Sequence, residues 1–198
     1  QRITDLLQKK YSATVQSFPS ALPNGVRVIS EQNPNVRSVS LGVWIASGTR
    51  HEPTALNGAS HFIEHMLFKG TKKRNAKAIS QAIEGQGGSI NAFTDKDNTC
   101  YYAKVPYDRA FNALEVLSDL YYNSIFDERE LNRERQVIAE EIFMYDDHPD
   151  SVAMDRLTGQ LWSGHPLGRP ILGPVENILS IPRERLLNYR ASQYAPSR

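Results

Sequence analysis

The segment His61-Phe62-Ile63-Glu64-His65 constrains this chain more than any other part of its sequence. On an α-helix, at about 100° per residue, its two histidines and its glutamate fall within one arc of about 100°. The apolar side chains in and after the segment fall on the opposite side: Phe62, Ile63, Met66 and Leu67. The pattern predicts an amphipathic helix from His61 to Lys69, with Gly70 as its C-terminal stop.

Two neutral imidazoles one helical turn apart can bind the same tetrahedral zinc ion, and a carboxylate beside them can take a proton from water bound to that zinc. The order of the letters, H-x-x-E-H, is the inverse of the H-E-x-x-H motif of many zinc proteases. A surface helix with two solvated histidines would have the same letters and the same apolar back. The segment alone therefore leaves both interpretations open.

A second predicted helix runs from Asp127 to about Tyr145, because Asp127 and Glu130 have the spacing of a capping box. Glu134 and Glu141 project together from the middle of its apolar face, and Glu140 lies at the margin of that face. A buried carboxylate is costly unless a cation or hydrogen-bond donors meet it. The helix therefore needs a partner for its two central glutamates.

Two kinds of partner are available to these carboxylates. Three arginines lie on the same helix, but they mostly point away from its apolar face: Arg129, Arg133 and Arg135. A metal ion held by the His61–Lys69 helix would compensate Glu141 well and would leave Glu140 outside the site. The helical geometry therefore selects Glu141 as the third ligand, after His61 and His65.

Composition excludes several other classes of protein. With 198 residues, 40% hydrophobic and 23% charged, the chain has the profile of a soluble globular protein with one large domain or two small ones. A net charge of +1 gives no reason to expect nucleic acid or an anionic membrane as the main partner. No apolar run approaches the ~18 residues of a membrane span. The one cysteine, Cys100, excludes an internal disulfide framework and leaves histidines and carboxylates as metal ligands.

The remaining patterns predict an α+β fold, with a mostly antiparallel sheet covered mainly on one face by helices. At least five strands are expected, at Thr14–Phe18, Val26–Ser30, Val39–Ile45, Ser89–Thr94 and Thr99–Val105. Further helices are expected at Ala76–Glu84 and from about Asp108 to Asn123, the latter burying Phe111, Leu114, Leu117 and Tyr121. The zinc site would lie between the two helices described above. Residues 1–12 are expected to be an N-terminal extension with a short amphipathic helix, and residues 13–198 the catalytic domain.

The sequence is similar to the pitrilysin family of zinc peptidases. The resemblance is carried by His61-Phe62-Ile63-Glu64-His65 with Met66-Leu67-Phe68-Lys69-Gly70-Thr71 after it, and by Arg133-Glu134-Arg135-Gln136-Val137-Ile138-Ala139-Glu140-Glu141-Ile142. In the family, the position that matches Glu141 is the third zinc ligand, and the position that matches Glu134 supports the site. Asn91-Ala92-Phe93-Thr94 resembles the segment that hydrogen-bonds an extended substrate backbone. The similarity covers roughly Pro23 to Tyr194 and is closest to the two-domain branch, which includes mitochondrial processing peptidase and bacterial processing proteases.

This resemblance implies a zinc-dependent endopeptidase that hydrolyses extended or unfolded peptides, and within that class a processing protease. One zinc ion per domain would be held by His61, His65 and Glu141, with Glu64 as the general base. The peptide substrate would add as a strand beside Asn91 and Ala92. Family members carry a second, similar domain that closes over the first. Residues 13–198 are therefore expected to be one half of a larger protein, partnered by a homologous C-terminal domain or by a second subunit in a dimer.

Two other functions remain open. The chain could be a catalytically silent core subunit of a respiratory complex, although a complete set of His61, Glu64, His65 and Glu141 argues against that. It could also be a metalloenzyme that cleaves no peptide, which the match around Asn91 makes less favourable. The expected location is the cytoplasm of a bacterium, with the mitochondrial matrix as the alternative.

Overall fold

The turn Asn24-Gly25 joins the first two strands, β1 (Gln16–Ala21) and β2 (Arg27–Gln32), in an antiparallel hairpin. Gly25 has a φ of +93°, a conformation that glycine adopts without steric cost. The computed structural model describes residues 16–196, so the extension expected at residues 1–12 lies outside the described residues.

The other three strands form a separate sheet in the order β3-β5-β4, with both pairs antiparallel. They are β3 (Ser38–Ile45), β4 (Ser89–Thr94) and β5 (Thr99–Pro106). All five expected strands are therefore present, but they are divided between two sheets. A period-two pattern identifies a strand and its buried face, and it does not identify the strand beside it.

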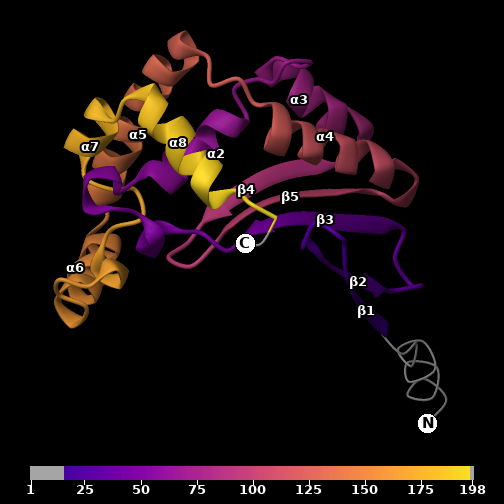
Figure 1. Cartoon of the computed structure of the whole chain (residues 1–198), viewed down its shortest axis with the longest axis horizontal. Helices are drawn as coiled ribbons and strands as arrows, with labels where there is room; N and C mark the ends of the chain where they lie inside the picture. The colour runs from indigo at the N-terminus through magenta and orange to yellow at the C-terminus, as the bar shows by residue number, and fades with distance from the viewer. Residues whose placement is uncertain (1–15, 197–198) are drawn as a thin grey trace.

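Helices cover one face of the three-stranded sheet, as expected. Figure 1 shows α3 (Ala76–Ile83) and α4 (Ala110–Asn123) lying over that face, while the β1–β2 hairpin projects from the region below β3. Beside the sheet lie α2 (Ala59–Leu67) and the long α5 (Glu128–Asp146). Gly70, with a φ of +138°, lets the chain turn after α2. In the described residues, no helix is long and apolar enough to cross a membrane.

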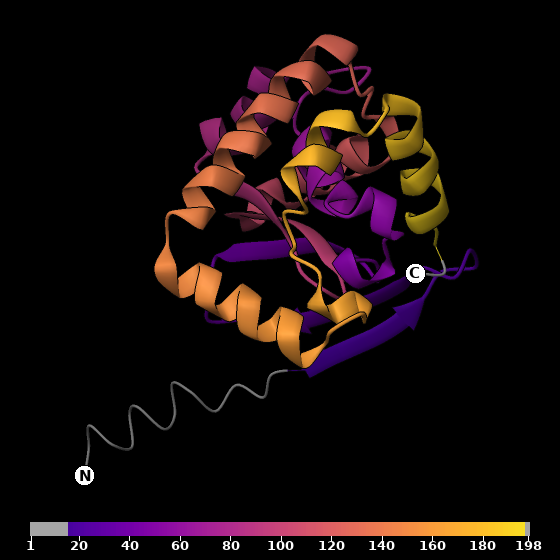
Figure 2. The same ribbon diagram turned by 90° about the vertical axis from the view of Figure 1, so that its left-hand side faces the viewer.

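The C-terminal third contains helices to which the sequence patterns assigned no boundaries. They are α6 (Pro149–Leu161), α7 (Val175–Ser180) and α8 (Arg183–Gln193). Figure 2 shows α5 continuing into α6 on one side of the molecule and α8 on the other. Short 3₁₀ turns complete the chain: η1 (Thr49–His51), η2 (Thr54–Leu56), η3 (Glu84–Gln86), η4 (Tyr107–Arg109) and η5 (Pro166–Gly168). The helices α6, α7 and α8 each start at a proline or directly after one, which is a signal available in the sequence.

The expected buried face of α4 is right for Leu117 and for Tyr121, which packs partly buried against the core, and wrong for Phe111 and Leu114. Phe111 is 87% exposed and Leu114 is half-exposed, whereas Leu117 is buried. The residues that face the sheet and α3 are smaller: Ala113, Val116, Leu117 and Leu120. This stripe is centred nearly opposite Phe111 on the helix, at about 190° by the 100° period. Two apolar stripes compete in this sequence, and the smaller side chains allow the closer packing.

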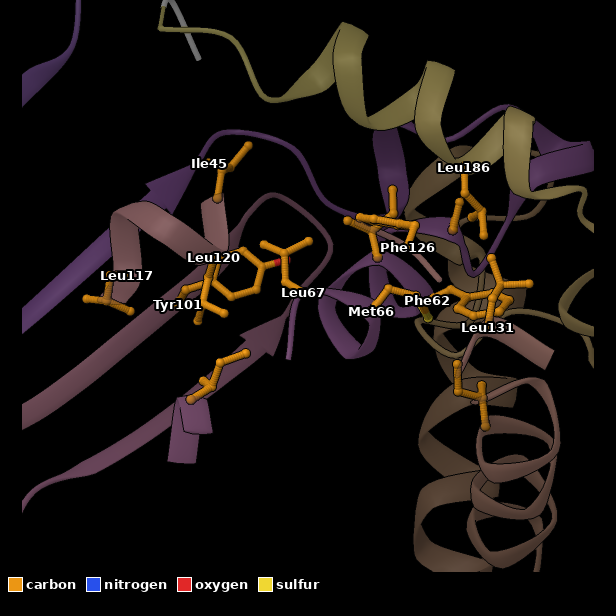
Figure 3. Close-up of a cluster of buried hydrophobic side chains, with 14 of the residues drawn as sticks. Ile45, Phe62, Met66, Leu67, Tyr101, Leu117, Leu120, Phe126, Leu131 and Leu186 are labelled. Carbon is orange, nitrogen blue, oxygen red and sulfur yellow. The ribbon is translucent and has the colours of Figure 1, made fainter. Parts of the chain in front are cut away.

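The apolar back of α2 is the centre of the core. Its four side chains are fully buried: Phe62, Ile63, Met66 and Leu67. Figure 3 shows Leu67 on the side of Tyr101 and Leu120, and Phe62 on the side of Leu131. Each fully buried side chain of this size contributes about 1.5–3 kcal/mol relative to exposure. This packing fixes the rotation of α2 and therefore the direction of its polar front.

Candidate metal centre

The N-terminus of α2 is held by a buried carboxylate. Glu52, 2% exposed, accepts hydrogen bonds from the amides of Gly58 (2.8 Å) and Ser60 (2.6 Å) and from Asn57 Nδ2 (3.0 Å). Burial raises the pKa of Glu52, and these hydrogen bonds oppose that rise. Gly58 has a φ of +97°, and a Cβ there would lie 2.6 Å from the carbonyl oxygen of Leu172. Backbone geometry and one acid therefore fix where the polar front of α2 begins.

The structure brings His61, His65 and Glu141 together. Glu141 Oε2, from α5, lies 3.8 Å from His61 Nε2 and 3.5 Å from His65 Nε2. One ligand atom from each residue can be chosen so that all lie within 4.8 Å of one another. A tetrahedral zinc ion with bonds of about 2.0–2.1 Å separates its ligands by about 3.3–3.5 Å. The observed distances are close to that spacing, so these three residues fit a zinc ion.

The two histidines differ in how deeply their imidazole rings are buried. His61 is 7% exposed, and burial lowers its pKa to about 3, with the neighbouring His65 imidazole adding to the effect. A neutral imidazole is the form that binds a metal. His65 is less buried, with its ring edge-on to His61 at a centroid distance of 4.5 Å. The alternative of two solvated histidines on a surface helix is therefore wrong.

Glu134 lies behind His65 and takes no part in the three-residue cluster. Its Oε2 is 3.1 Å from His65 Nδ1, and its Oε1 is 2.7 Å from Lys69 Nζ. Burial by itself raises the pKa of Glu134, but the hydrogen bonds from His65 and Lys69 hold it below its usual value. Arg133 pairs with Glu130 instead. The arginines of α5 are therefore not the partners of this buried carboxylate.

Glu64 reaches from α2 to the end of strand β4. Thr94 Oγ1 donates a hydrogen bond of 2.5 Å to Glu64 Oε2. Burial raises the pKa of Glu64, and the hydrogen bond from Thr94 and the proximity of His65 oppose that rise. A carboxylate beside two metal-ligand candidates is placed to accept and return a proton, and a raised pKa makes it a stronger base.

Asn91 and Ala92 lie on β4, three and two residues before Thr94, respectively. Within the described residues β4 pairs with β5 alone, so its other edge is free. The amide of Ala92 donates to the Asn91 side chain at 2.9 Å, which places that amide on the free edge and not on the β5 side. The two residues therefore lie on an open strand edge that the Thr94–Glu64 hydrogen bond connects to α2.

Three contacts of this site were not predicted from the sequence: those of Glu52, Thr94 and Lys69. The Glu52 contact to the start of α2 spans a loop, and the Thr94 contact spans 30 residues, so helical or strand periodicity could not reveal either. Lys69 was expected only as the last residue of the His61–Lys69 helix. Its position four residues after His65 was the available signal that both side chains lie on the same side of α2.

Comparison with known proteins agrees with this geometry. The family described as "Insulinase (Peptidase family M16)" matches residues 27–175. The chain is 49% identical over 175 residues to the uncharacterized zinc protease YmxG of Bacillus subtilis (strain 168), covering 88% of this chain and 43% of that protein. It is 45% identical over 179 residues to a probable mitochondrial-processing peptidase subunit beta of Arabidopsis thaliana, covering 90% of this chain and 34% of that protein.

Solved structures share the fold. A protease from Helicobacter pylori aligns with a TM-score of 0.88 and 26% identity, over 92% of this chain and 44% of that one. Pitrilysin aligns with a TM-score of 0.83 and 25% identity, over 94% of this chain and 20% of that one. This chain therefore spans less than half the length of these relatives.

Proposed function

This chain belongs to the insulinase family of peptidases, family M16, and from that membership we infer that it is the zinc-binding part of a metalloendopeptidase acting on extended or unfolded peptides. The resemblance of the sequence to the pitrilysin family is thereby confirmed. The observation that carries the proposal is the convergence of His61, His65 and Glu141 within 4.8 Å, from two helices that are far apart in the sequence.

One zinc ion would be held by His61, His65 and Glu141. When bound, zinc acts as a Lewis acid that polarises a peptide carbonyl and acidifies a water molecule. Glu64 takes the proton of the attacking water and returns it to the leaving amine, since its carboxylate is on the same side of α2 as the two histidines. Glu134 has a supporting role, because it holds the Nδ1 side of His65 and leaves Nε2 facing Glu141.

The free edge of β4 supports an extended substrate. A peptide paired with this edge would receive main-chain hydrogen bonds near Asn91 and Ala92 and would run past Thr94 toward Glu64. An extended or unfolded peptide fits this edge, because a folded substrate would have its own backbone groups already paired.

A second half is part of the proposal. The matched region covers 43% of the Bacillus subtilis relative and 34% of the Arabidopsis thaliana relative, so more than half of each relative has no counterpart in this chain. Large apolar side chains are exposed on the β1–β2 hairpin and on the uncovered face of the three-stranded sheet, such as Ile29 (78%) and Trp44 (61%). A contiguous apolar patch marks an interaction site, and the exposed ring of Trp44 contacts that of Phe93 at a centroid distance of 5.6 Å. We therefore propose a homologous C-terminal domain, or a second subunit in a dimer, as the partner.

We also propose narrower assignments for the function and the location. A processing protease is favoured by the similarity to a mitochondrial-processing peptidase subunit. A bacterial cytoplasmic location is favoured by the bacterial relative and by a single cysteine that is free and buried, with the mitochondrial matrix as the alternative. The silent structural subunit is disfavoured, because the structure keeps Glu64 and the three-residue cluster together.

Two measurements test the function. Elemental analysis of the purified protein should give one zinc per chain, and a fluorogenic-peptide assay should show hydrolysis that stops with a chelator and returns with zinc. Zinc without any hydrolysis, even with the second half present, would favour the silent subunit. Hydrolysis that persists in chelator with no zinc bound would refute the metallopeptidase.

A further inference from the structure

Lys69 lies in the turn that follows α2, four residues after His65. Its backbone amide donates to the carbonyl of Met66 at 3.2 Å, and its ammonium group lies 2.7 Å from Glu134 Oε1. The other oxygen of the same carboxylate, Oε2, lies 3.1 Å from His65 Nδ1. Two side chains from the α2 segment therefore hold the two oxygens of one carboxylate that comes from α5.

Glu134 depends on this arrangement because it is 4% exposed. A carboxylate buried to this degree is costly without a compensating charge. His65 adds no charge if it is a neutral ligand, since its one proton is then on Nδ1 and its Nε2 lone pair faces the metal. Arg135, the adjacent arginine, donates instead to the carbonyl oxygens of Ile178 and Ile181. In the described part of the chain, Lys69 is thus the one permanent cation paired with Glu134.

The two histidines differ in how their rings are fixed. Nδ1 of His61 is buried and has no hydrogen-bond partner among the described residues, so no hydrogen bond fixes that side of the ring. His65 is more exposed, and its Nδ1 faces Glu134. The orientation and tautomer of His65 therefore depend on where Glu134 points.

We propose that Lys69 is a positioning residue of the metal centre. By occupying Oε1 of Glu134, it keeps Oε2 directed at the Nδ1–H of His65, and the Nε2 lone pair of His65 then faces Glu141. This inference rests on the proposed function, because it assigns Lys69 to the site that would hold zinc. It adds a third layer to that site: the metal ligand His65, the carboxylate of Glu134 behind it, and the cation that orients the carboxylate.

Zinc affinity is the first test, measured by competition with a chromophoric chelator. Lys69→Met removes the charge and keeps an unbranched stem, and it should weaken zinc binding about 10–100-fold, as loss of a partner behind a ligand usually does. Lys69→Arg retains the charge and should restore most of the affinity. Lys73→Met is the matched control, because Lys73 is exposed and pairs with Glu115 on the surface; its affinity should equal that of the wild type.

The second readout needs no metal. In the ¹⁵N spectrum of the metal-free protein at pH 8, His65 should be the Nδ1–H tautomer in the wild type and a mixture of tautomers in Lys69→Met, while His61 stays unchanged. A general loss of stability would not change one imidazole selectively. In a Glu134→Gln background, Lys69→Met should have little further effect on either readout, because the carboxylate that links the two residues is already gone.

The outcomes separate this inference from the proposed function. Wild-type zinc affinity and an unchanged His65 tautomer in folded Lys69→Met would overturn the role of Lys69 and leave the zinc site intact. A wild-type protein that binds no zinc would overturn the proposed function, and the tautomer measurement would still decide whether Lys69 orients His65. Circular dichroism reports folding, and Lys69→Gln replaces Lys69→Met if the latter does not fold.

Discussion

At the scale of single residues, two neighbouring glutamates of α5 face different surroundings. Glu141 Oε2 is 3.5 Å from His65 Nε2, whereas Glu140 is exposed and lies outside the cluster. We expect Glu141→Gln to weaken zinc binding strongly and Glu140→Gln to leave it nearly intact. His61→Ala should abolish stoichiometric zinc, because two remaining protein ligands make a weak site. Elemental analysis after dialysis measures this, and equal losses in the two glutamate variants would contradict the assignment.

Glu64 is expected to be needed for hydrolysis and not for the metal. Its carboxylate bonds to Thr94 and is not among the three clustered ligand candidates. Glu64→Gln should keep its zinc and lose about 10²–10⁴-fold in peptide turnover, the range for a positioned general base. Turnover per bound zinc is the measurement. A variant with near wild-type turnover would remove Glu64 from the mechanism.

Thr94 gives a related prediction with a chemical control. Its hydroxyl donates to Glu64 Oε2, so Thr94→Val keeps the shape and removes the donor. A hydrogen bond to a charged group contributes about 1.5–3 kcal/mol, so turnover should fall about 10-fold or more while zinc content is unchanged. Thr94→Ser restores a donor and should recover most of the rate. If valine and serine variants lose activity equally, the hydroxyl has no role in holding Glu64.

These residues also show how far the sequence alone could specify the site. Helical periodicity identified four residues of the site. His61, Glu64 and His65 lie on one side of a single predicted helix, and Glu141 lies with Glu134 on the apolar face of another. The contact of Thr94 with Glu64 depends on which strand lies beside α2, and no local pattern contains that information. The pairing of Glu134 with Lys69 needs the relative rotation of two helices, which packing determines.

At the scale of the elements, Asp119 connects α4 to the turn after α2. This buried carboxylate accepts hydrogen bonds from Thr71 Oγ1 (2.7 Å), Arg74 Nη1 (2.7 Å) and Asn123 Nδ2 (2.8 Å). Burial by itself raises its pKa, but these three donors hold the pKa below its usual value of 3.8. Because the pKa is lower in the folded protein, the stabilisation is fully present above about pH 4 and is lost as the pH falls through the folded pKa.

We expect Asp119→Asn to lower the free energy of unfolding by about 1–3 kcal/mol at neutral pH. The difference from the wild type should shrink as the pH falls below about 3.8, where the Asp119 carboxyl group gains its proton in the unfolded chain before it does so in the folded protein. Glu115→Gln is the control, since Glu115 pairs with the same Arg74 but is half-exposed, and its effect should stay under about 1 kcal/mol. Urea denaturation at several pH values measures both, and a pH-independent Asp119→Asn effect would contradict the prediction.

The elements themselves differed in how well their patterns predicted them. Strands β3, β4 and β5 and helices α2, α3 and α5 were located to within a few residues, since each has one consistent buried face. The predicted buried face of α4 was displaced from the observed one, because Phe111 and Leu114 lie on the exposed side while Leu117 is buried. Helix α6 has no fully buried residue, so its sequence lacks the periodicity that identifies a helix.

At the scale of the whole molecule, the described residues leave the candidate site open on one side. The candidate zinc ligand Glu141 is 45% exposed in its side chain, and the edge of β4 is open within the described residues. A peptide held there would remain in contact with water on its other side. Hydrolysis is faster when water is excluded around the reacting carbonyl, and lids or second domains supply that exclusion in many enzymes.

The residues from 1 to 198 are therefore expected to bind zinc and to cleave peptides slowly on their own. Adding the proposed homologous second half, in the same chain or as a separate subunit, should raise turnover per bound zinc without changing zinc affinity, because all three ligand candidates are already in this segment. The comparison needs the isolated segment, the full assembly and an assembly carrying Glu64→Gln, which excludes a contribution from the added half. Equal turnover for the segment and the assembly would show that this domain is self-sufficient, and closure by a second half would then have no part in the mechanism.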